Sequence, residues 1–398
     1  MQILVFAVGI VLFIGLVLVH EWGHYLFARR NGVDVEEFGL FFPPRIWSKK
    51  LKSGMRLSVN WIPLGGFVKL KGENDSDSRP RTLGSASLGT KSKIMLAGVT
   101  MNLLAGIFIL MILAWIGMPK MITKDNPYIN EDQFTVASDT KVIHNEVLAH
   151  YIIPGSPAQH IGLSGYDSLI SLSNGAKTYH INSVEDLQQA TKGFAGQKII
   201  LTYKNGGQIF QKQVKLLSKK AVQDSQKTNN PQGYLGVEDP TLVQIQRSTW
   251  SAPVVAVGLT GQIFKLTFVG LGHALGGLGS AIAGLVTQNH QARENGQTNA
   301  SNQVGGPVAI GYALWGAGNL GINVMLFLIA LISLTLALMN ALPIPALDGG
   351  RLAMMLISRG IFKRPLTRAA EERIVGASFM VLIALVVLIT LVDVKRFF

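Results

Sequence analysis

The chain has 398 residues, of which 48% are hydrophobic and only 15% are charged. Soluble domains carry about a quarter charged residues, and the apolar residues here lie in long blocks, so the composition indicates membrane spans rather than one soluble core. The absence of cysteine excludes disulfides, thiolate catalysis and cysteine-ligated metals. The formal net charge of +13 fits membrane topology and attraction to anionic membrane lipid. No basic helix or aromatic–basic motif supports nucleic acid as a partner.

The first predicted element is an apolar helix over 1–30. The run ILVFAVGIVLFIGLVLV at 3–19 leads directly into HEWGHYLFA. A cleaved signal peptide would need a basic start and small residues at its cleavage site, whereas this chain begins Met-Gln-Ile and continues into HEWGH. We therefore expect a retained membrane span.

Three later segments reach the ~20 apolar residues that a bilayer core requires. They are predicted as transmembrane helices over 94–118, 321–342 and 374–392. The stretch 252–287 is also apolar, but it contains Lys265, His273 and many glycines, so we expect an interfacial or amphipathic helix there rather than a fifth span. The predicted fold class is a polytopic α-helical membrane protein with four transmembrane helices.

Basic residues in the short loops predict the orientation of these spans. Thirteen Lys and Arg lie in 29–93 and six lie in 351–373, which places both loops in the cytoplasm. Four spans then place the N-terminus and the C-terminus outside. The long segment 119–320 carries no weight in this argument, because the charge rule applies only to short loops.

Two parts of the chain outside the spans are predicted to contain strands. Residues 140–218 alternate strand-like runs with turn signals, and a helix is expected after Ser183 as N-cap, which together predict an inserted α+β domain. A linker with flexible polar loops at 219–233 and 289–303 follows within 219–320. The cytoplasmic loop 31–93 is predicted to hold a β-hairpin over 54–72, with Gly65-Gly66 as its turn.

The segment HEWGH at 20–24 matches H-E-x-x-H. On a helix, His20 and His24 lie on one face and can bind one metal ion. Glu21 is placed to take a proton from a water molecule at that metal. Ionisable groups at the end of an apolar helix cost a few kcal/mol, so a shared Zn²⁺ explains them better than chance packing or capping histidines.

A hydrolytic zinc site needs a third protein ligand and an open position for water. Asp348 is the only acidic residue in 321–357, where no histidine occurs. It lies in NALPIPALDGGR, and Pro343 and Pro345 interrupt the third span, which membranes tolerate where irregular backbone lines a cavity. A helix N-cap is the alternative for Asp348, but the need for a third ligand favours the metal.

Two of the asparagines within the predicted spans, Asn340 and Asn102, have both a functional and a structural interpretation. Asn340, eight residues before Asp348, could hold a substrate backbone or a developing oxyanion through its amide. An interhelical hydrogen bond explains Asn340 almost equally well. For Asn102 in the second span, the structural alternative is favoured.

These motifs together resemble the site-2 protease family. The resemblance rests on HEWGH after the first span, on N-x-x-P-x-x-x-x-D-G from Asn340 to Gly349, and on PGSPA in the insert. IPLGGFVKLKGE at 62–73 resembles the membrane-associated β-hairpin of the bacterial RseP-type branch, and GGPVAI at 305–310 resembles its element before the third span. One PDZ-like unit is evident, as in the single-PDZ members.

The resemblance implies an intramembrane zinc metalloprotease of the bacterial inner membrane. Its expected substrates are single-pass membrane proteins, such as anti-sigma factors or remnant signal peptides, cut within their spans in regulated proteolysis. It implies Zn²⁺ bound by His20, His24 and Asp348, with Glu21 as catalytic acid/base and Asn340 as a substrate-holding residue. The PDZ-like domain, expected outside the cytoplasm, is a candidate site for peptide tails.

The chain departs from that branch at two places. Leu-Phe-Phe-Pro-Pro at 40–44 replaces the usual Gly-Phe-Gly-Pro run, and Ala-Gly-Val at 97–99 replaces Ala-Gly-Pro. These differences concern the cytoplasmic face rather than the chemistry. Two other functions remain as alternatives: a membrane scaffold whose PDZ-like domain binds exported tails, and a metal transporter. Glu21 argues against the scaffold, and the single interrupted helix argues against the repeats of a transporter.

The predicted hairpin suggests how a substrate helix becomes cleavable. Unwound backbone in a membrane needs hydrogen-bond partners, and an exposed strand edge offers them. We hypothesise that the stretch from Leu57 to Trp61, or that from Phe67 to Leu70, pairs with the extended substrate. The side chains involved are Leu57, Val59, Trp61, Phe67 and Val68. Alternatively, Trp61 and Phe67 only anchor the loop to lipid.

Overall fold

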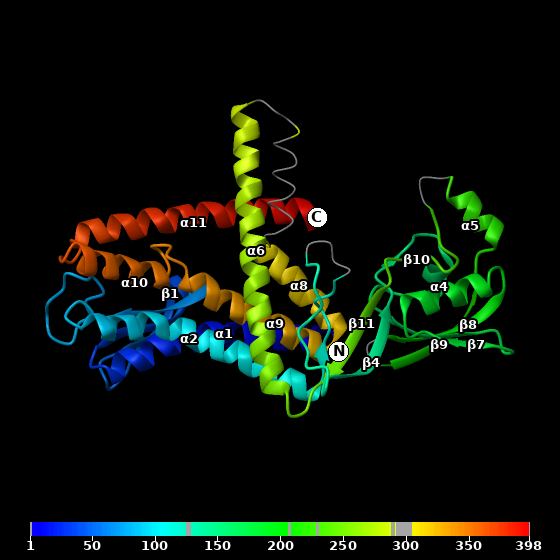
Figure 1. The fold of residues 1–398 in the computed structure, drawn as a ribbon, viewed down its shortest axis with the longest axis horizontal. Coiled ribbons are helices and arrows are strands. Elements are labelled where there is room, and N and C mark those ends of the chain that lie inside the picture. Colours follow the sequence, from blue (N-terminus) through cyan, green and yellow to red (C-terminus); the bar gives the residue numbers. More distant parts are fainter. Residues whose placement is uncertain are drawn as a thin grey trace. The chain divides into compact units, whose positions relative to one another are not determined.

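The computed structural model describes residues 2–124, 129–205, 208–227, 231–287, 291 and 305–397 (Figure 1). The chain divides into two compact units. The insert unit holds Met1–Phe6, Met111–Val255 and Trp315–Phe327. The helical unit holds Ala7–Leu110, Ala256–Leu314 and Leu328–Phe398.

Among the described residues, five helices are long and apolar enough to cross a membrane. They are α1 (Gln2–Arg30), α2 (Leu88–Ile116), α6 (Ala252–Val286), α9 (Ile322–Ala341) and α11 (Arg368–Phe397). These helices show a multi-pass membrane protein. The four predicted spans correspond to α1, α2, α9 and α11, each displaced by a few residues at its ends. By length and composition, α6 meets the same criteria for a membrane-spanning helix as the four helices that were predicted to span.

The direction of α6 distinguishes it from the other long helices. Within the helical unit, α6 runs across the direction shared by α1, α2 and α9 (Figure 1). One face of α6 is buried through Leu259, Ile263 and Ala274.

Shorter helices connect the long ones. They are α8 (Pro307–Leu320), which includes the segment before the third span, α10 (Asp348–Leu356) and a π-helical turn η1 (Ile357–Ile361). One buried apolar core joins the end of α1, both strands of the loop between α1 and α2, the start of α2 and α10, through Ala28, Val35, Leu70, Ile94 and Met355.

Two long antiparallel strands lie in the loop between α1 and α2 of the helical unit. β1 (Val35–Lys50) and β2 (Arg56–Leu70) are joined by a turn in which Leu51 N–H donates to Met55 O at 2.8 Å. The predicted hairpin over 54–72 therefore needs correction, because Gly65-Gly66 lie inside β2 and the turn lies earlier. β1 was not predicted from the sequence, because its prolines and charged residues interrupt the alternation of polar and apolar residues that is typical of a strand.

The strand β1 pairs with β2 in two places. Residues 45–50 of β1 face residues 56–60 of β2, and residues 35–40 of β1 face both 56–59 and 66–70. Residues 56–59 therefore have strand partners on both sides. In the described part of the chain, residues 66–70 have a strand partner on one side only.

Buried charges hold the loop between β2 and α2. The Lys91 ammonium is fully buried and donates to the Asp75 carboxylate and, at 2.9 Å, to the Gly84 carbonyl. Arg359 of η1 donates to both Asp75 oxygens, at 3.0 and 2.8 Å. Burial alone would raise the pKa of Asp75, but the hydrogen bonds from Arg359 and Lys91 outweigh it and lower the pKa. Asp75 therefore stays ionised inside the loop.

The insert unit is built on a seven-stranded sheet. Its strands are β3 (Met118–Pro119), β4 (Lys141–Leu148), β6 (Ser168–Ser173), β7 (Thr178–His180), β8 (Lys198–Asn205), β9 (Gln208–Lys215) and β11 (Thr241–Arg247). The order is β3-β11-β4-β6-β8-β9, with β7 paired to β6. A separate pair joins β5 (Tyr151–Ile152) to β10 (Val237–Glu238).

The insert extends beyond the predicted range 140–218. β11 pairs with β4, and Leu235 completes the core around Leu172 and Leu201, so the domain continues to Arg247. Helix α3 (Pro157–His160) begins within the PGSPA segment. Helix α4 (Val184–Gly193) begins as predicted, because the Ser183 hydroxyl accepts a hydrogen bond from Asp186 N–H at 3.0 Å.

One predicted loop of the insert is helical at its start. Helix α5 (Lys219–Ser225) is capped by Ser218, whose hydroxyl accepts from Ala221 N–H at 3.2 Å. The expected flexible loop over 219–233 is therefore wrong for its first half. Residues 228–230 and most of the predicted loop 289–303 lie outside the described residues.

Candidate metal centre

The last turns of α1 carry the two histidines of the HEWGH segment. One helical turn separates His20 from His24, and their Nε2 atoms lie 3.3 Å apart. Both rings are largely buried, with 12% and 9% of their side-chain surface exposed. The helix therefore presents two imidazole nitrogens to one point, as the spacing predicts.

The carboxylate of Asp348 reaches the same point from the other end of the chain. Its Oδ2 lies 3.2 Å from His20 Nε2 and 3.1 Å from His24 Nε2. Asp348 is the first residue of α10, and Leu347 is the N-cap of that helix. Helix capping, the alternative for Asp348, is therefore excluded.

Two glycines allow the interrupted segment to present Asp348. A Cβ built on Gly349 would lie 2.3 Å from the Ala341 carbonyl oxygen, and one on Gly350 would lie 1.9 Å from that of Ile344. Any larger residue would push α10 away from the end of α9. The sequence Asp-Gly-Gly thus folds the backbone tightly back on itself, so that the carboxylate starts a helix beside the metal centre.

Helices α1 and α2 approach closely at the metal centre. A Cβ on Gly98 of α2 would lie 2.4 Å from His24 Nε2 and 2.8 Å from His20 Nε2. On the facing helix, a Cβ on Gly23 would lie 2.7 Å from the Ala97 carbonyl oxygen. In the sequence, Gly98 was noted only as part of the Ala-Gly-Val segment at 97–99. Because Gly98 lies opposite HEWGH, pairing the two predicted helices could have indicated its contact with the two histidines.

The donor set fits a catalytic zinc ion. The three ligand atoms of His20, His24 and Asp348 all lie within 4.8 Å of one another, and this is the one such group found in the described residues. Two imidazole nitrogens and one carboxylate oxygen match the ligand types of hydrolytic zinc sites, which keep a fourth position open. The set also suits zinc because it contains no soft sulfur donor.

Glu21 lies beside the three candidate ligands without belonging to their group. It accepts a hydrogen bond from the backbone of Val68 in β2. A Cβ on Gly66 would lie 3.2 Å from Glu21 Cγ and 3.2 Å from the Gly39 carbonyl oxygen. Glycine at position 66 therefore lets β2 pass directly over the Glu21 side chain.

The other predicted site residues occupy different surroundings. Asn340 is half-buried in the last turn of α9, and its contact with substrate stays a prediction. Leu57 and Val59 lie where β2 has partners on both sides, so they offer no strand edge. Trp61 is 70% exposed and has no strand partner in the register. Phe67 and Val68 lie on the one-sided stretch 66–70.

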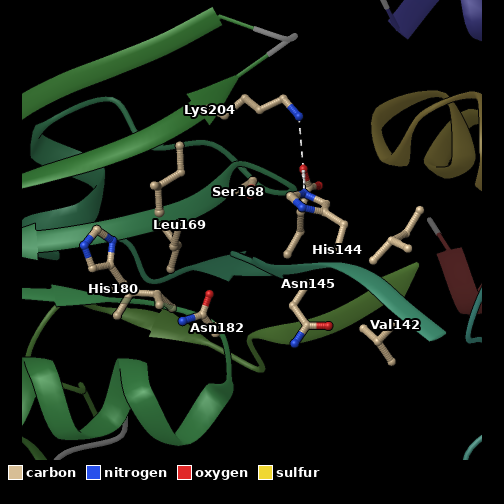
Figure 2. Close-up of a pocket in the computed structure, with 12 residues that line it drawn as sticks. Val142, His144, Asn145, Ser168, Leu169, His180, Asn182 and Lys204 are labelled. Carbon is tan, nitrogen blue, oxygen red and sulfur yellow. Dashed lines mark hydrogen bonds and ion pairs between the residues drawn. The ribbon is translucent and has the colours of Figure 1, made fainter. Parts of the chain in front are cut away.

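The insert unit contains a separate hollow of about 470 Å³ (Figure 2). It is lined by residues of β4, β6, β7 and β8, among them His180. Glu146 accepts from His144 at 2.9 Å and from Lys204 at 3.0 Å. Burial raises the pKa of Glu146, but these two hydrogen bonds outweigh it and lower the pKa. The carboxylate of Glu146 in the hollow is thus already paired with His144 and Lys204.

Comparisons with known proteins agree with this chemistry. The model of peptidase family M50 matches residues 8–385. A Clostridium perfringens protein named as a predicted zinc metalloprotease is 28% identical over 96% of each chain. An Agrobacterium fabrum protein with the same description is 28% identical over 96% of this chain and 93% of its own. An Enterococcus faecalis protein named as a predicted protease, Eep, is 24% identical over 98% of each chain.

The close approach of α2 generates the first testable prediction. Gly98→Ala should lower the zinc affinity of the purified protein by at least ~10-fold, because its methyl group displaces the His24 ring from the ligand position. Gly15→Ala on α1 is the matched control, since a Cβ there meets nothing within 4 Å. Zinc content after dialysis against a chelator series measures the effect. Equal zinc retention by both variants would contradict the proximity argument.

Proposed function

Because this chain belongs to peptidase family M50, we propose that it hydrolyses peptide bonds within the membrane spans of single-pass proteins. It is a zinc metalloendopeptidase of the site-2 protease type, and Zn²⁺ is its cofactor. The observation that carries the proposed substrate class is the location of the site. His20, His24 and Asp348 converge beside Glu21 where apolar helices meet, so a substrate must reach them from within the membrane.

In the proposed reaction, the bound zinc, Glu21 and Asn340 have different roles. Bound zinc supplies a Lewis acid that polarises the peptide carbonyl and brings the pKa of a water to about 7. Glu21, at hydrogen-bond distance from the β2 backbone, is placed to accept a proton from the attacking water and deliver it to the leaving amine. Asn340, at the end of α9, donates from its amide to the substrate backbone or oxyanion.

The one-sided stretch of β2 is the proposed docking edge for the unwound substrate. An unpaired backbone group costs several kcal/mol in a membrane, so the cleavable segment needs partners. Residues 66–70 have no strand partner on one side, and the N–H groups of Val68 and Leu70 donate to the side chains of Glu21 and Glu73 rather than to β1. A segment that pairs there would therefore lie beside the catalytic glutamate. The stretch from Leu57 to Trp61 is no longer a candidate, because residues 57–59 are already paired on both sides.

The geometry also supports the orientation inferred from charge. His24 and Asp348 place the end of α1 and the segment after α9 at one site, and the Ile94 carbonyl, near the start of α2, accepts a hydrogen bond from His24. The loops that follow α1 and α9 therefore lie on one side of the membrane. If the chain crossed the membrane an odd number of times between α2 and α9, these two loops would lie on opposite sides of the membrane. In the proposed orientation α6 is therefore not a single additional membrane crossing.

We place these two loops in the cytoplasm, and both termini and the insert outside the cytoplasm of a bacterial cell. The basic residues of the two short loops support this assignment. The hollow in the insert, with its paired charges, is the proposed contact for exposed peptide tails of the substrate.

The role of Glu21 leads to the second prediction. Glu21→Gln should keep zinc but lower the rate of cleavage of a reconstituted single-span substrate by ~10²–10⁴-fold, because a proton acceptor is removed while the ligands remain. Glu372→Gln, at an exposed ion pair with Arg368, is the matched control and should cleave normally. Cleavage by Glu21→Gln at the wild-type rate would rule out this role. If zinc-loaded wild type binds exported peptides but cuts no spanning segment, the scaffold function is supported instead.

The docking edge leads to the third prediction. Val68→Pro removes an N–H donor of this stretch that also contacts Glu21, so it should slow cleavage of a helical spanning substrate more than cleavage of an already extended peptide, with unchanged zinc content. Trp61→Ser tests the alternative of lipid anchoring, since it removes exposed apolar surface without touching the edge. The pairing hypothesis fails if Val68→Pro slows both substrates equally, or if only Trp61→Ser has an effect.

The orientation leads to the fourth prediction. A reporter fused after Lys49 or after Arg364 should be cytoplasmic, and one inserted near Asn229, outside the described residues, should be external. Enzymatic reporters active on only one side of the membrane provide the measurement. An external signal at Lys49 would invert the whole orientation. Opposite signals at Lys49 and Arg364 would contradict the argument from the shared site.

A further inference from the structure

The two histidines differ in what holds the ring nitrogen that faces away from the metal. His24 Nδ1 lies 2.8 Å from the Ile94 carbonyl oxygen, which can only accept. The proton of the neutral ring is therefore on Nδ1, which leaves the Nε2 lone pair available for a metal ion shared with Asp348. This is the usual support of a metal-binding histidine.

The corresponding nitrogen of His20 faces Asn102 of α2. Asn102 Nδ2 lies 3.4 Å from His20 Nδ1, and only 1% of Asn102 is exposed. The Oδ1 atom of the same amide is buried and has no hydrogen-bond partner. A buried amide that leaves its oxygen unpaired beside a ring nitrogen calls for an explanation.

The chemistry of the ring determines which amide atom must face it. His20 Nε2 lies with His24 Nε2 and Asp348 Oδ2 in the metal centre, so Nε2 is the ligand atom. His20 Nδ1 then carries the proton and needs an acceptor. The amide nitrogen can only donate. A half-turn of the amide about its Cβ–Cγ bond exchanges nitrogen for oxygen at almost unchanged shape and brings Oδ1 to the ring.

We propose that Asn102 is a positioning residue for the metal centre. Its Oδ1 accepts the Nδ1–H of His20 and thereby fixes the tautomer in which Nε2 binds zinc. This inference rests on the metal centre of the proposed function and adds a residue to it. In the orientation of the structure, Oδ1 of the amide lacks a hydrogen-bond partner. The half-turn gives Oδ1 a partner in the His20 ring, which distinguishes this contact from an ordinary interhelical hydrogen bond.

The main chain at the same position provides a matched control. The Ser333 hydroxyl of α9 donates to the backbone carbonyl of Asn102 at 2.8 Å, and Ser333 is fully buried. This bond ties α9 to α2 without contacting either histidine. Ser333→Ala thus removes a structural hydrogen bond at Asn102 while leaving its amide beside His20.

The fifth prediction compares Asn102→Leu, Asn102→Asp and Ser333→Ala in full-length protein, without any cleavage assay. Zinc affinity is measured by competition with a chelator, ligand geometry by the visible spectrum of the Co²⁺-loaded protein, and apo stability by thermal unfolding. Asn102→Leu should weaken zinc binding ~10–100-fold with an altered cobalt spectrum, and its apo melting temperature should be unchanged or higher. Asn102→Asp, which can still accept a hydrogen bond from His20 Nδ1–H, should bind zinc like wild type. Ser333→Ala should melt lower with wild-type zinc affinity.

Several results would overturn the proposal. Wild-type zinc affinity in Asn102→Leu would show that His20 needs no acceptor. A loss of affinity in Asn102→Asp as large as in Asn102→Leu would exclude acceptance as the role. A lower apo melting temperature in Asn102→Leu, with an unchanged cobalt spectrum, would make Asn102 structural. A failure of the proposed protease function is distinguishable, because it would leave these binding data intact and abolish only hydrolysis.

Discussion

The convergence of two imidazoles and one carboxylate among apolar helices is the constraint on which the rest of the structure depends. Ionisable groups at membrane depth are costly unless they share a partner. His20, His24 and Asp348 share one only if three separate backbone segments come within a few ångströms of one point. Gly98 and Gly350 allow this approach, because a Cβ at either would overlap a ligand ring or the backbone.

A second network, of hydrogen bonds and ion pairs, connects β2 to the helices that follow Asp348. Glu73 accepts from Leu70 N–H at 2.9 Å, at the end of β2, and from Arg351 of α10 at 3.4 Å. Two residues later, Asp75 accepts from Lys91 and Arg359. Removing one partner of a buried ion pair typically costs about 3–5 kcal/mol, so this loop is firmly held. These bonds thereby hold β2, which passes over Glu21, in a fixed position relative to α10, which begins with Asp348.

The division into a helical unit and an insert unit separates two kinds of chemistry. The metal centre, the strand edge and the buried Asp75–Lys91 ion pair belong to the helical unit. The insert has its own core and its own polar hollow. Because fold alone does not specify function, the assignment as a zinc metalloprotease rests on the site and on relatives that match nearly the whole chain.

The amino-acid sequence by itself determined the features that depend on local pattern. Apolar runs of membrane length predicted α1, α2, α9 and α11, and the helical spacing of His20 and His24 predicted a shared ligand face. The Ser183 cap was likewise local. Asp348 could be nominated as the third ligand because its segment offers no other acidic residue or histidine.

Only the tertiary structure decided the features that depend on distant segments meeting. β1 pairs with β2 at two separate registers, which turned a supposed hairpin turn at Gly65-Gly66 into the middle of a strand and left residues 66–70 as the free edge. Asn102 looked like an ordinary interhelical residue until α2 was seen to place its amide at His20. The physical reason is the same in both cases. Strand partners and the hydrogen bonds of a metal ligand are set by the packing of segments far apart in the chain, and no periodicity within one segment records them.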